Sequence, residues 1–212
     1  MKITVMGLGL HGGGLASTRF FAAHCADVTA TDLRDEKTLA ESIAALRGYP
    51  VRFVLGEHRM EDFSGADLVI KNPAVPADSP YLAAASAVET DISIFLRLSR
   101  RPVIAVTGSK GKSTTASALA YALRRACPDS KLGGNITVSP LTFLEHCTLP
   151  SDDPVVLELS SWQLADIPDI SLLKPRISIV TNLLHDHQDK YPDMESYAAD
   201  KKRIFVSQDT GD

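Results

Sequence analysis

The segment VIAVTGSKGKSTT, residues 103–115, joins a β-branched run to a glycine-rich turn and an Ala- and Leu-rich stretch reaching about Ala126. This order predicts a buried strand, a phosphate-binding loop and a helix. Backbone N–H groups of residues 108–112 would surround a β-phosphate, Lys112 would bridge the β- and γ-oxygens, and Ser113 would hold Mg²⁺. The usual Walker pattern has glycine where this chain has Val106, so the loop is a shorter variant. The alternative is a structural Gly-Lys-Ser turn that binds nothing.

A second glycine turn lies near the start of the chain. The motif GLGLHG, residues 7–12, follows a predicted strand at residues 3–6 and precedes a predicted helix at residues 15–23. Asp32 ends the next strand about 20 residues later, where a Rossmann acid accepts hydrogen bonds from a ribose. Glycines and a helix N-terminus suit any nucleotide diphosphate, and taken alone the pattern indicates NAD. A tight turn without a ligand, with Asp32 as a helix cap or a solvated acid, is the alternative.

Short β-rich runs alternate with helical patterns along the whole chain. This alternation predicts an α/β fold with mainly parallel, helix-covered sheets. The further predicted strands cover residues 28–31, 52–55, 68–70, 155–159 and 177–181. A helical pattern at residues 91–99 ends before Arg100-Arg101-Pro102, which predicts a Rossmann-like domain at 1–101 and a P-loop-type domain at 102–212. The second domain supplies only about two convincing strands after its first helix, so we expect a truncated piece of a longer protein.

Composition excludes several classes of protein. The 212 residues are 44% hydrophobic and 23% charged, which excludes disorder. Lys and Arg number 22 against 26 Asp and Glu, a net charge of −4, so we expect no nucleic-acid partner. No apolar run is long enough to span a membrane and no secretion signal is evident, so we expect a cytoplasmic location. The three cysteines, Cys25, Cys127 and Cys147, have no metal-type spacing.

Two segments carry candidate metal ligands. Glu158 ends an apolar strand at the sheet edge where ligands bind, and together with Ser113 it makes a credible Mg²⁺ site. A carboxylate that caps the following helix is the alternative. The triplet at residues 185–187, His-Asp-His, lacks the partners that a tetrahedral zinc site needs.

Lys201 is predicted to face inward. On a helix that begins at Met194, it lies within an apolar stripe formed by Met194, Tyr197, Ala198, Ile204 and Phe205. Burial disfavours an ammonium group, and a neutral amine can add CO₂. The alternative is a lysine that extends to solvent from a basic helix end.

Several segments together resemble the Mur ligases. Residues 107–115, TGSKGKSTT, resemble the ATP loop of that family. Further blocks agree in type and order, namely GGNI at 133–136, ELSSWQL at 158–164, Asn182, DHQDKY at 186–191 and YAADK at 197–201. The ELSSWQL block particularly resembles the branch of the family that adds D-glutamate.

The resemblance implies a role for each of the following residues. ATP would be bound by Gly108, Ser109, Lys110, Gly111, Lys112, Ser113 and Thr114. The first domain would hold a UDP moiety, with Asp32, Leu33 and Arg34 at the uracil and Leu10, His11 and Gly12 along the diphosphate. Asn72 lies in a substrate loop, residues 71–76, where Ala74 replaces a frequent glycine. Ser160 would contact substrate, and Asn135 and His187 would position the acceptor carboxylate. Two Mg²⁺ sites would use Ser113 with Glu158, and His187 with a carbamylated Lys201.

The resemblance implies an ATP-dependent amide ligase of peptidoglycan precursor synthesis. Such an enzyme phosphorylates the carboxylate of UDP-N-acetylmuramoyl-L-alanine, and the amine of D-glutamate then attacks the acyl phosphate. We expect a monomer without membrane or nucleic-acid partners. The family's third, C-terminal domain is not in this sequence, so we expect no turnover by this chain alone. The alternatives are a non-catalytic UDP-sugar binder, an NAD oxidoreductase, and sibling ligases that add another amino acid.

Overall fold

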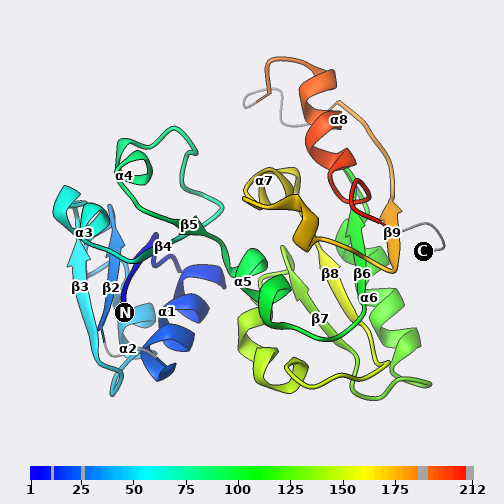
Figure 1. Cartoon of the computed structure of the whole chain (residues 1–212), viewed down its shortest axis with the longest axis horizontal. Helices are drawn as coiled ribbons and strands as arrows, with labels where there is room; N and C mark the ends of the chain where they lie inside the picture. The colour runs from blue at the N-terminus through cyan, green and yellow to red at the C-terminus, as the bar shows by residue number, and fades with distance from the viewer. Residues whose placement is uncertain (11, 25–26, 186–190, 209–212) are drawn as a thin grey trace. The chain divides into compact units, whose positions relative to one another are not determined.

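The computed structural model describes residues 1–10, 12–24, 27–185 and 191–208. The chain divides into two compact units, Met1–Ile94 and Phe95–Asp212, each built around its own sheet (Figure 1). The division falls inside a helix, α5 (Asp91–Leu98), whereas the seam predicted from the sequence lies just after that helix. Both sheets are entirely parallel, which confirms the predicted α/β class.

The first unit has a five-stranded sheet in the order β3-β2-β1-β4-β5. The strands are β1 (Lys2–Met6), β2 (Asp27–Asp32), β3 (Val51–Leu55), β4 (Leu68–Lys71) and β5 (Val88–Glu89). The strand order reverses between β1 and β4, and doubly wound sheets bind ligands outside the carboxyl ends of the strands at such a point. No strand was predicted at β5, because two residues are too few to show the alternation of apolar and polar side chains that marks a strand.

Hydrophobic residues cover both faces of this sheet. One cluster contains Leu8, Ala30, Leu39 and Leu46, and the other contains Met6, Phe63, Ala66, Val69 and Leu82. The helices are α1 (Gly13–His24), α2 (Ala40–Ala44), α3 (Met60–Ser64), α4 (Pro80–Ala83) and α5. A Cβ on Gly14 would lie 2.0 Å from the carbonyl oxygen of Gly7, so a glycine is required where α1 meets the first turn.

The second unit has a four-stranded sheet in the order β7-β8-β6-β9. The strands are β6 (Val103–Thr107), β7 (Lys131–Gly134), β8 (Val155–Glu158) and β9 (Ile177–Val180). In the part of this unit that the structure describes, three strands therefore follow α6, and the prediction of about two was wrong. β7 was missed because its sequence KLGG ends in two glycines, which have low β-propensity.

Small residues bring the first helix of this unit close to its sheet. The helices are α6 (Lys112–Leu123), α7 (Ser161–Ala165) and α8 (Met194–Lys202), with 3₁₀ turns η1 (Pro140–Cys147) and η2 (Ile170–Leu172). Ala116 and Ala120 of α6 pack on Ile104, Val106 and Val156. The phosphate loop thus enters α6 from the end of a fully buried central strand.

The inward face of α8 was predicted only in part. Tyr197, Lys201 and Ile204 are buried, as the apolar stripe indicates. Phe205 lies beyond the end of the helix and is 44% exposed, so its assignment to the stripe was wrong.

None of the helices in the described residues is long and apolar enough to cross a membrane. Cys127 and Cys147 form no disulfide, and Cys25 lies outside the described residues.

Candidate functional site

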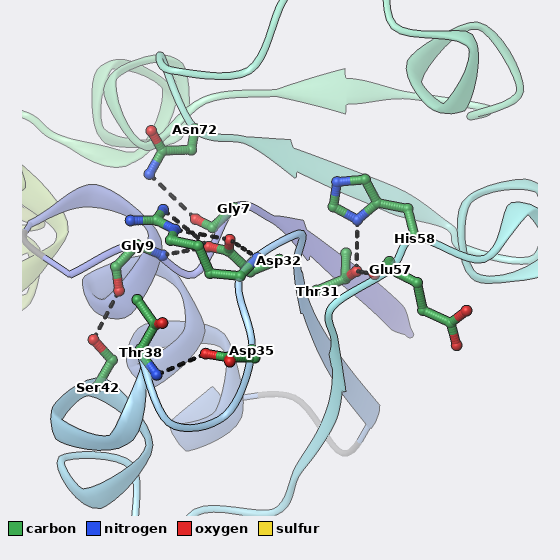
Figure 2. Close-up of polar contacts among 11 residues, drawn as sticks. Gly7, Gly9, Thr31, Asp32, Asp35, Thr38, Ser42, Glu57, His58 and Asn72 are labelled. Atoms are coloured by element: carbon green, nitrogen blue, oxygen red, sulfur yellow. Dashed lines mark hydrogen bonds and ion pairs between the residues drawn. The ribbon is translucent and has the colours of Figure 1, made fainter.

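The first glycine turn follows β1 at the carboxyl edge of the five-stranded sheet. Gly7, Gly9 and Gly12 have φ values of +89°, +71° and +75°, which residues with a Cβ rarely adopt. The N–H of Gly7 donates to the carbonyl oxygen of Thr31 at 2.8 Å, and the N–H of Gly9 donates to Oδ2 of Asp32 at 2.9 Å (Figure 2). The end of β2 therefore fixes the turn.

Asp32 accepts four hydrogen bonds from the protein itself. Oδ1 accepts from the backbone N–H and Nε of Arg34, both at 3.0 Å. Oδ2 accepts from Gly9 and from Nη2 of Arg34, the latter at 3.2 Å. Burial alone would raise the pKa of Asp32, but the hydrogen bonds from Arg34 and Gly9 outweigh it and hold the pKa below 3.8. This carboxylate organises the site, and a ligand donor that reached it would have to displace one of these bonds.

Acid should therefore destabilise the first unit through Asp32. The pKa of Asp32 is lower in the folded protein than its ordinary value of 3.8 in the unfolded chain, so ionised Asp32 stabilises the folded state. This contribution is fully present above pH 3.8 and is lost as the pH falls through the lower, folded-state pKa. We expect Asp32→Asn to cost about 2 kcal/mol at neutral pH and to flatten the loss of stability below pH 4. Urea unfolding followed by circular dichroism measures both effects.

The control for this experiment is Asp27→Asn, since Asp27 is exposed at the start of β2. The same acid dependence in wild type and Asp32→Asn would contradict the role assigned to Asp32.

A cavity of about 730 Å³ opens beside this turn. Its walls come from the segments that follow β1, β2, β3 and β4 and from the start of α4. The lining residues include Gly7, Asp32, Leu33, Arg34, His58, Asn72 and Tyr81. Leu33 is 67% exposed, which leaves its side chain available to a ligand. Four of these residues, Asp32, Leu33, Arg34 and Asn72, were predicted from the sequence; His58 and Tyr81 were not.

Asn72 connects the cavity wall to the glycine turn. Its Nδ2 donates to the carbonyl oxygen of Gly7 at 3.2 Å, and its Oδ1 accepts from the N–H of Ala74 at 3.0 Å. Leu10 is 40% exposed at the same turn. His11, predicted along the diphosphate, lies outside the described residues.

The second glycine turn, the predicted phosphate loop, lies between β6 and α6. Gly108 has a φ of +140°, and Gly111 has a φ of +82° as the residue that precedes the helix. Nζ of Lys112 donates to the carbonyl oxygens of Gly108 at 2.9 Å and Ser109 at 3.0 Å, so its ammonium lies across the loop. Ser113 and Thr114 are exposed in the first turn of α6, where a phosphate-bound ion could reach a hydroxyl.

The segment after β9 holds the loop from the other side. Thr181 donates to the carbonyl oxygen of Lys110 at 2.7 Å, and Oδ1 of Asn182 accepts from the N–H of Lys110 at 2.9 Å. The buried hydroxyl of Ser109 accepts from the N–H of Leu184 at 2.9 Å and lies 3.0 Å from the hydroxyl of Tyr197. Ser109 therefore connects the loop to the rest of the domain, and its hydroxyl is turned away from solvent.

Two glycine substitutions in the loop should have unequal effects. A Cβ on Gly108 would lie 2.0 Å from Oγ1 of Thr181, and the backbone there is strained for any other residue. We expect Gly108→Ala to cost about 3 kcal/mol or more. A Cβ on Gly111 meets nothing within 4 Å, so Gly111→Ala should cost only about 1 kcal/mol, from its positive φ.

Trp162 is the chain's single tryptophan and lies in α7 of the second unit. Its fluorescence during urea unfolding therefore measures the free energy of unfolding of both variants. Equal losses of stability would contradict the packing described for Gly108.

Glu158 offers an unsatisfied carboxylate oxygen beside the loop. It ends β8, which pairs with β6 so that Glu158 lies opposite Val106. The side chain is fully buried, Oε1 accepts from Nδ2 of Asn135 at 3.0 Å, and Oε2 has no hydrogen bond among the described residues. A buried carboxylate oxygen without a partner is costly, and a hard cation would satisfy it. The donor set therefore fits Mg²⁺, although no group of three or more His, Cys, Asp or Glu ligands occurs in the described ranges.

Lys201 reaches the phosphate loop from α8. The residue is 2% exposed, its Nζ donates to the carbonyl oxygen of Gly108 at 3.0 Å, and the same nitrogen lies 4.5 Å from the ring centroid of Tyr197. The structure thus brings Lys201 and Lys112 to the same carbonyl oxygen. His187, predicted to act with Lys201, lies outside the described residues.

Ser160 has a local structural role. Its hydroxyl accepts from the N–H of Gln163 at 3.1 Å, and the side chain of Gln163 accepts from the N–H of Ser160 at 3.1 Å. This capping box begins α7 immediately after the strand that carries Glu158. The predicted substrate contact of Ser160 stays a prediction.

Both units match family models. Residues 1–94 match the Mur ligase MurD-like, N-terminal domain, and residues 106–212 match the Mur ligase middle domain. The curated UDP-N-acetylmuramoylalanine--D-glutamate ligase of Treponema pallidum (strain Nichols) is 53% identical, over 99% of this chain and 42% of the relative. The protein of the same name from Borreliella afzelii (strain PKo) is 48% identical, over 100% of this chain and 46% of the relative. The chain thus spans less than half the length of these relatives.

The fold agrees with a solved structure. UDP-N-acetylmuramate:L-alanyl-gamma-D-glutamyl-meso-diaminopimelate ligase from Neisseria meningitides superposes with a TM-score of 0.64 at 17% identity, covering 99% of this chain and 68% of that one. At this identity the likeness shows a shared fold.

Proposed function

Because the chain belongs to the Mur ligase family, we propose that it forms two nucleotide-binding parts of an ATP-dependent amide ligase. The reaction joins D-glutamate to UDP-N-acetylmuramoyl-L-alanine during peptidoglycan precursor synthesis, in the cytoplasm and as a monomer. The names of the two relatives support the choice of amino acid. The observation that carries the proposal is that Lys112 and Lys201 both donate to the carbonyl oxygen of Gly108 in the loop after β6. Oε2 of Glu158, which has no hydrogen-bond partner in the described residues, lies at the end of the neighbouring strand.

The two units divide the substrates between them. The first, taken as residues 1–101, binds the UDP moiety in the 730 Å³ cavity, with Leu33, Arg34 and Asn72 at the ligand. The bound moiety also lies along the glycine turn, next to Leu10 and Gly12. The second, residues 102–212, binds ATP at residues 108–114. Support comes from the positive φ values in both turns, which let phosphates approach the backbone.

The reaction proceeds in two steps. A carboxylate oxygen of the L-alanyl group attacks the γ-phosphorus of ATP, ADP leaves, and an acyl phosphate forms. The amine of D-glutamate then attacks the acyl carbon, phosphate leaves, and the amine loses a proton as the amide forms. Activation is required because a carboxylate is a very poor acyl donor.

Residues of this chain neutralise the negative charge of the phosphates and position the acceptor during phosphoryl transfer. The ammonium of Lys112 exchanges its two loop carbonyl contacts for the β- and γ-oxygens and neutralises the charge that moves between them. Asn135, held by Glu158, and His187 position the acceptor carboxylate. Ser113 and Glu158 would hold one Mg²⁺, and His187 with a carbamylated Lys201 would hold a second. Magnesium supplies further neutralisation of phosphate charge when bound.

Calorimetric titration with UDP-N-acetylmuramoyl-L-alanine, with NAD as the control ligand, tests the substrate half of this proposal. We expect saturable binding of the muramoyl nucleotide and none of NAD. Binding of NAD without binding of the muramoyl nucleotide would contradict the proposal. It would indicate instead that the first glycine turn binds a dinucleotide.

A further inference from the structure

Thr137 adopts a backbone conformation that is costly for its residue type. Its φ is +66°, and among the described residues it is the only one other than glycine with a positive φ. A β-branched side chain crowds the backbone there, so this conformation raises the free energy of the folded state. Glycine would adopt the same φ without that cost. Backbone strain of this kind clusters at active sites and ligand clamps.

The loop that contains Thr137 is fixed at both ends. It joins β7 to η1, and the N–H of Gly134 donates to the carbonyl oxygen of Val138 at 2.8 Å. The N–H of Asn135 donates to the carbonyl oxygen of Glu158 at 2.8 Å, and a Cβ on Gly134 would lie 2.1 Å from that oxygen. These contacts leave residues 134–138 little freedom, and they impose the positive φ of Thr137.

The backbone contacts do not account for a threonine at this position, because none of them uses its side chain. The side chain of Thr137 is exposed, and its hydroxyl donates to the carbonyl oxygen of Ile136 at 2.6 Å. While that bond is made, the single hydrogen of the hydroxyl is occupied, and Oγ1 can only accept from a ligand. Oγ1 forms no other hydrogen bond with the residues that the structure describes. Thr137 therefore offers an acceptor two residues after Asn135.

We propose that Thr137 is a specificity-determining residue whose hydroxyl accepts a hydrogen bond from the amide N–H of the L-alanyl group. This inference rests on the proposed function, which assigns the carboxylate of that group to Asn135. One carbon atom separates the amide nitrogen from the carboxylate, so a ligand held at Asn135 presents its N–H to the same loop. UDP-N-acetylmuramate lacks the alanyl N–H and would leave Oγ1 without a donor. Thr137 thus favours the alanylated nucleotide over the one without alanine.

Calorimetric titration of the whole chain with UDP-N-acetylmuramoyl-L-alanine and with UDP-N-acetylmuramate measures this preference as a ratio of affinities. We expect wild type to bind the alanyl form about tenfold more tightly. Thr137→Gly suits the positive φ but has no hydroxyl, so the ratio should fall by about 3- to 10-fold. Thr137→Ser retains the hydroxyl and should keep most of the ratio. The wild-type ratio in Thr137→Gly, or an equal loss in Thr137→Ser, would overturn the proposal.

Thr148→Gly is the matched control. Thr148 is an exposed threonine of the same unit whose hydroxyl donates to the carbonyl oxygen of Glu145 at 2.9 Å, but its φ is −76°. Its replacement should leave the ratio unchanged and lower the melting temperature, because glycine adds entropy to the unfolded chain. Thr137→Gly should lower the melting temperature less, since it also removes the backbone strain. A larger fall for Thr137→Gly would show that the threonine is kept for stability, and would overturn the proposal.

Two results with wild type separate this inference from the proposed function. Equal affinities for the two nucleotides would overturn the role of Thr137 and leave the proposed function standing. No binding of either nucleotide would overturn the substrate side of the proposed function, and this inference with it.

Discussion

Lys112→Ala is expected to weaken ATP binding by about 100-fold or more and to leave the affinity for UDP-N-acetylmuramoyl-L-alanine unchanged. The ammonium lies across the phosphate loop, 2.9 Å and 3.0 Å from two loop carbonyl oxygens, in the position from which it can reach a bound phosphate chain. The cavity that we assign to UDP belongs to the other unit and shares no residue with this loop. Two separate calorimetric titrations, one with each nucleotide, measure the effect.

Lys202→Ala is the matched control, because Lys202 is an exposed lysine in the same unit. It should change neither affinity. Equal losses of ATP and UDP-substrate binding in Lys112→Ala would contradict the assignment of one nucleotide to each unit.

Glu158→Gln is expected to remove most of the effect of Mg²⁺ on ATP binding. In wild type, Mg²⁺ should tighten ATP binding, because the unsatisfied Oε2 of Glu158 lies at the end of the strand beside the phosphate loop. The amide keeps an oxygen for Nδ2 of Asn135 but removes the charge, so the gain from Mg²⁺ should shrink by about tenfold or more. ATP titrations with and without Mg²⁺ give this gain for each protein.

The control is Glu145→Gln, at an exposed acid in the 3₁₀ turn η1 of the same unit, and it should retain the full effect of Mg²⁺. If Mg²⁺ tightens ATP binding to Glu158→Gln as much as to wild type, the assignment of Glu158 as a metal ligand is contradicted.

Thermal melting separates this role from a structural one. Glu158→Gln should not lower the melting temperature, because it replaces a buried carboxylate whose second oxygen has no hydrogen-bond partner in the described residues.

Local patterns in the sequence predicted the parts of the site that lie along one strand, turn or helix. The position of the glycine turn after β6 and that of Glu158 at the end of β8 were predicted because each follows a β-branched run that ends at the sheet edge. The inward direction of Lys201 was found because a helical period brings it into line with Tyr197. These features depend on neighbours within a few residues, which a sequence displays directly.

Features that depend on distant segments were not predicted. His58 meets Thr31 and Tyr81 only because three segments converge at one edge of the sheet. Nothing near Asp32 in the sequence shows that Gly9 also donates to it. Ser109 was predicted as a ligand of ATP from its place in the loop, whereas its hydroxyl bonds to Leu184, which is 75 residues away. Long-range hydrogen bonds of this kind leave no periodic signal.

The central claim is that the chain carries two nucleotide sites, one in each unit. It is tested most directly by amide NMR of the labelled chain, titrated first with UDP-N-acetylmuramoyl-L-alanine and then with ATP and Mg²⁺. We predict that the first ligand shifts the amides of Gly7, Gly9 and Asn72, and that the second shifts those of Gly108, Gly111 and Ser113. Shifts from both ligands at the same glycine turn, or no shift at residues 7–12 with the muramoyl nucleotide, would contradict it.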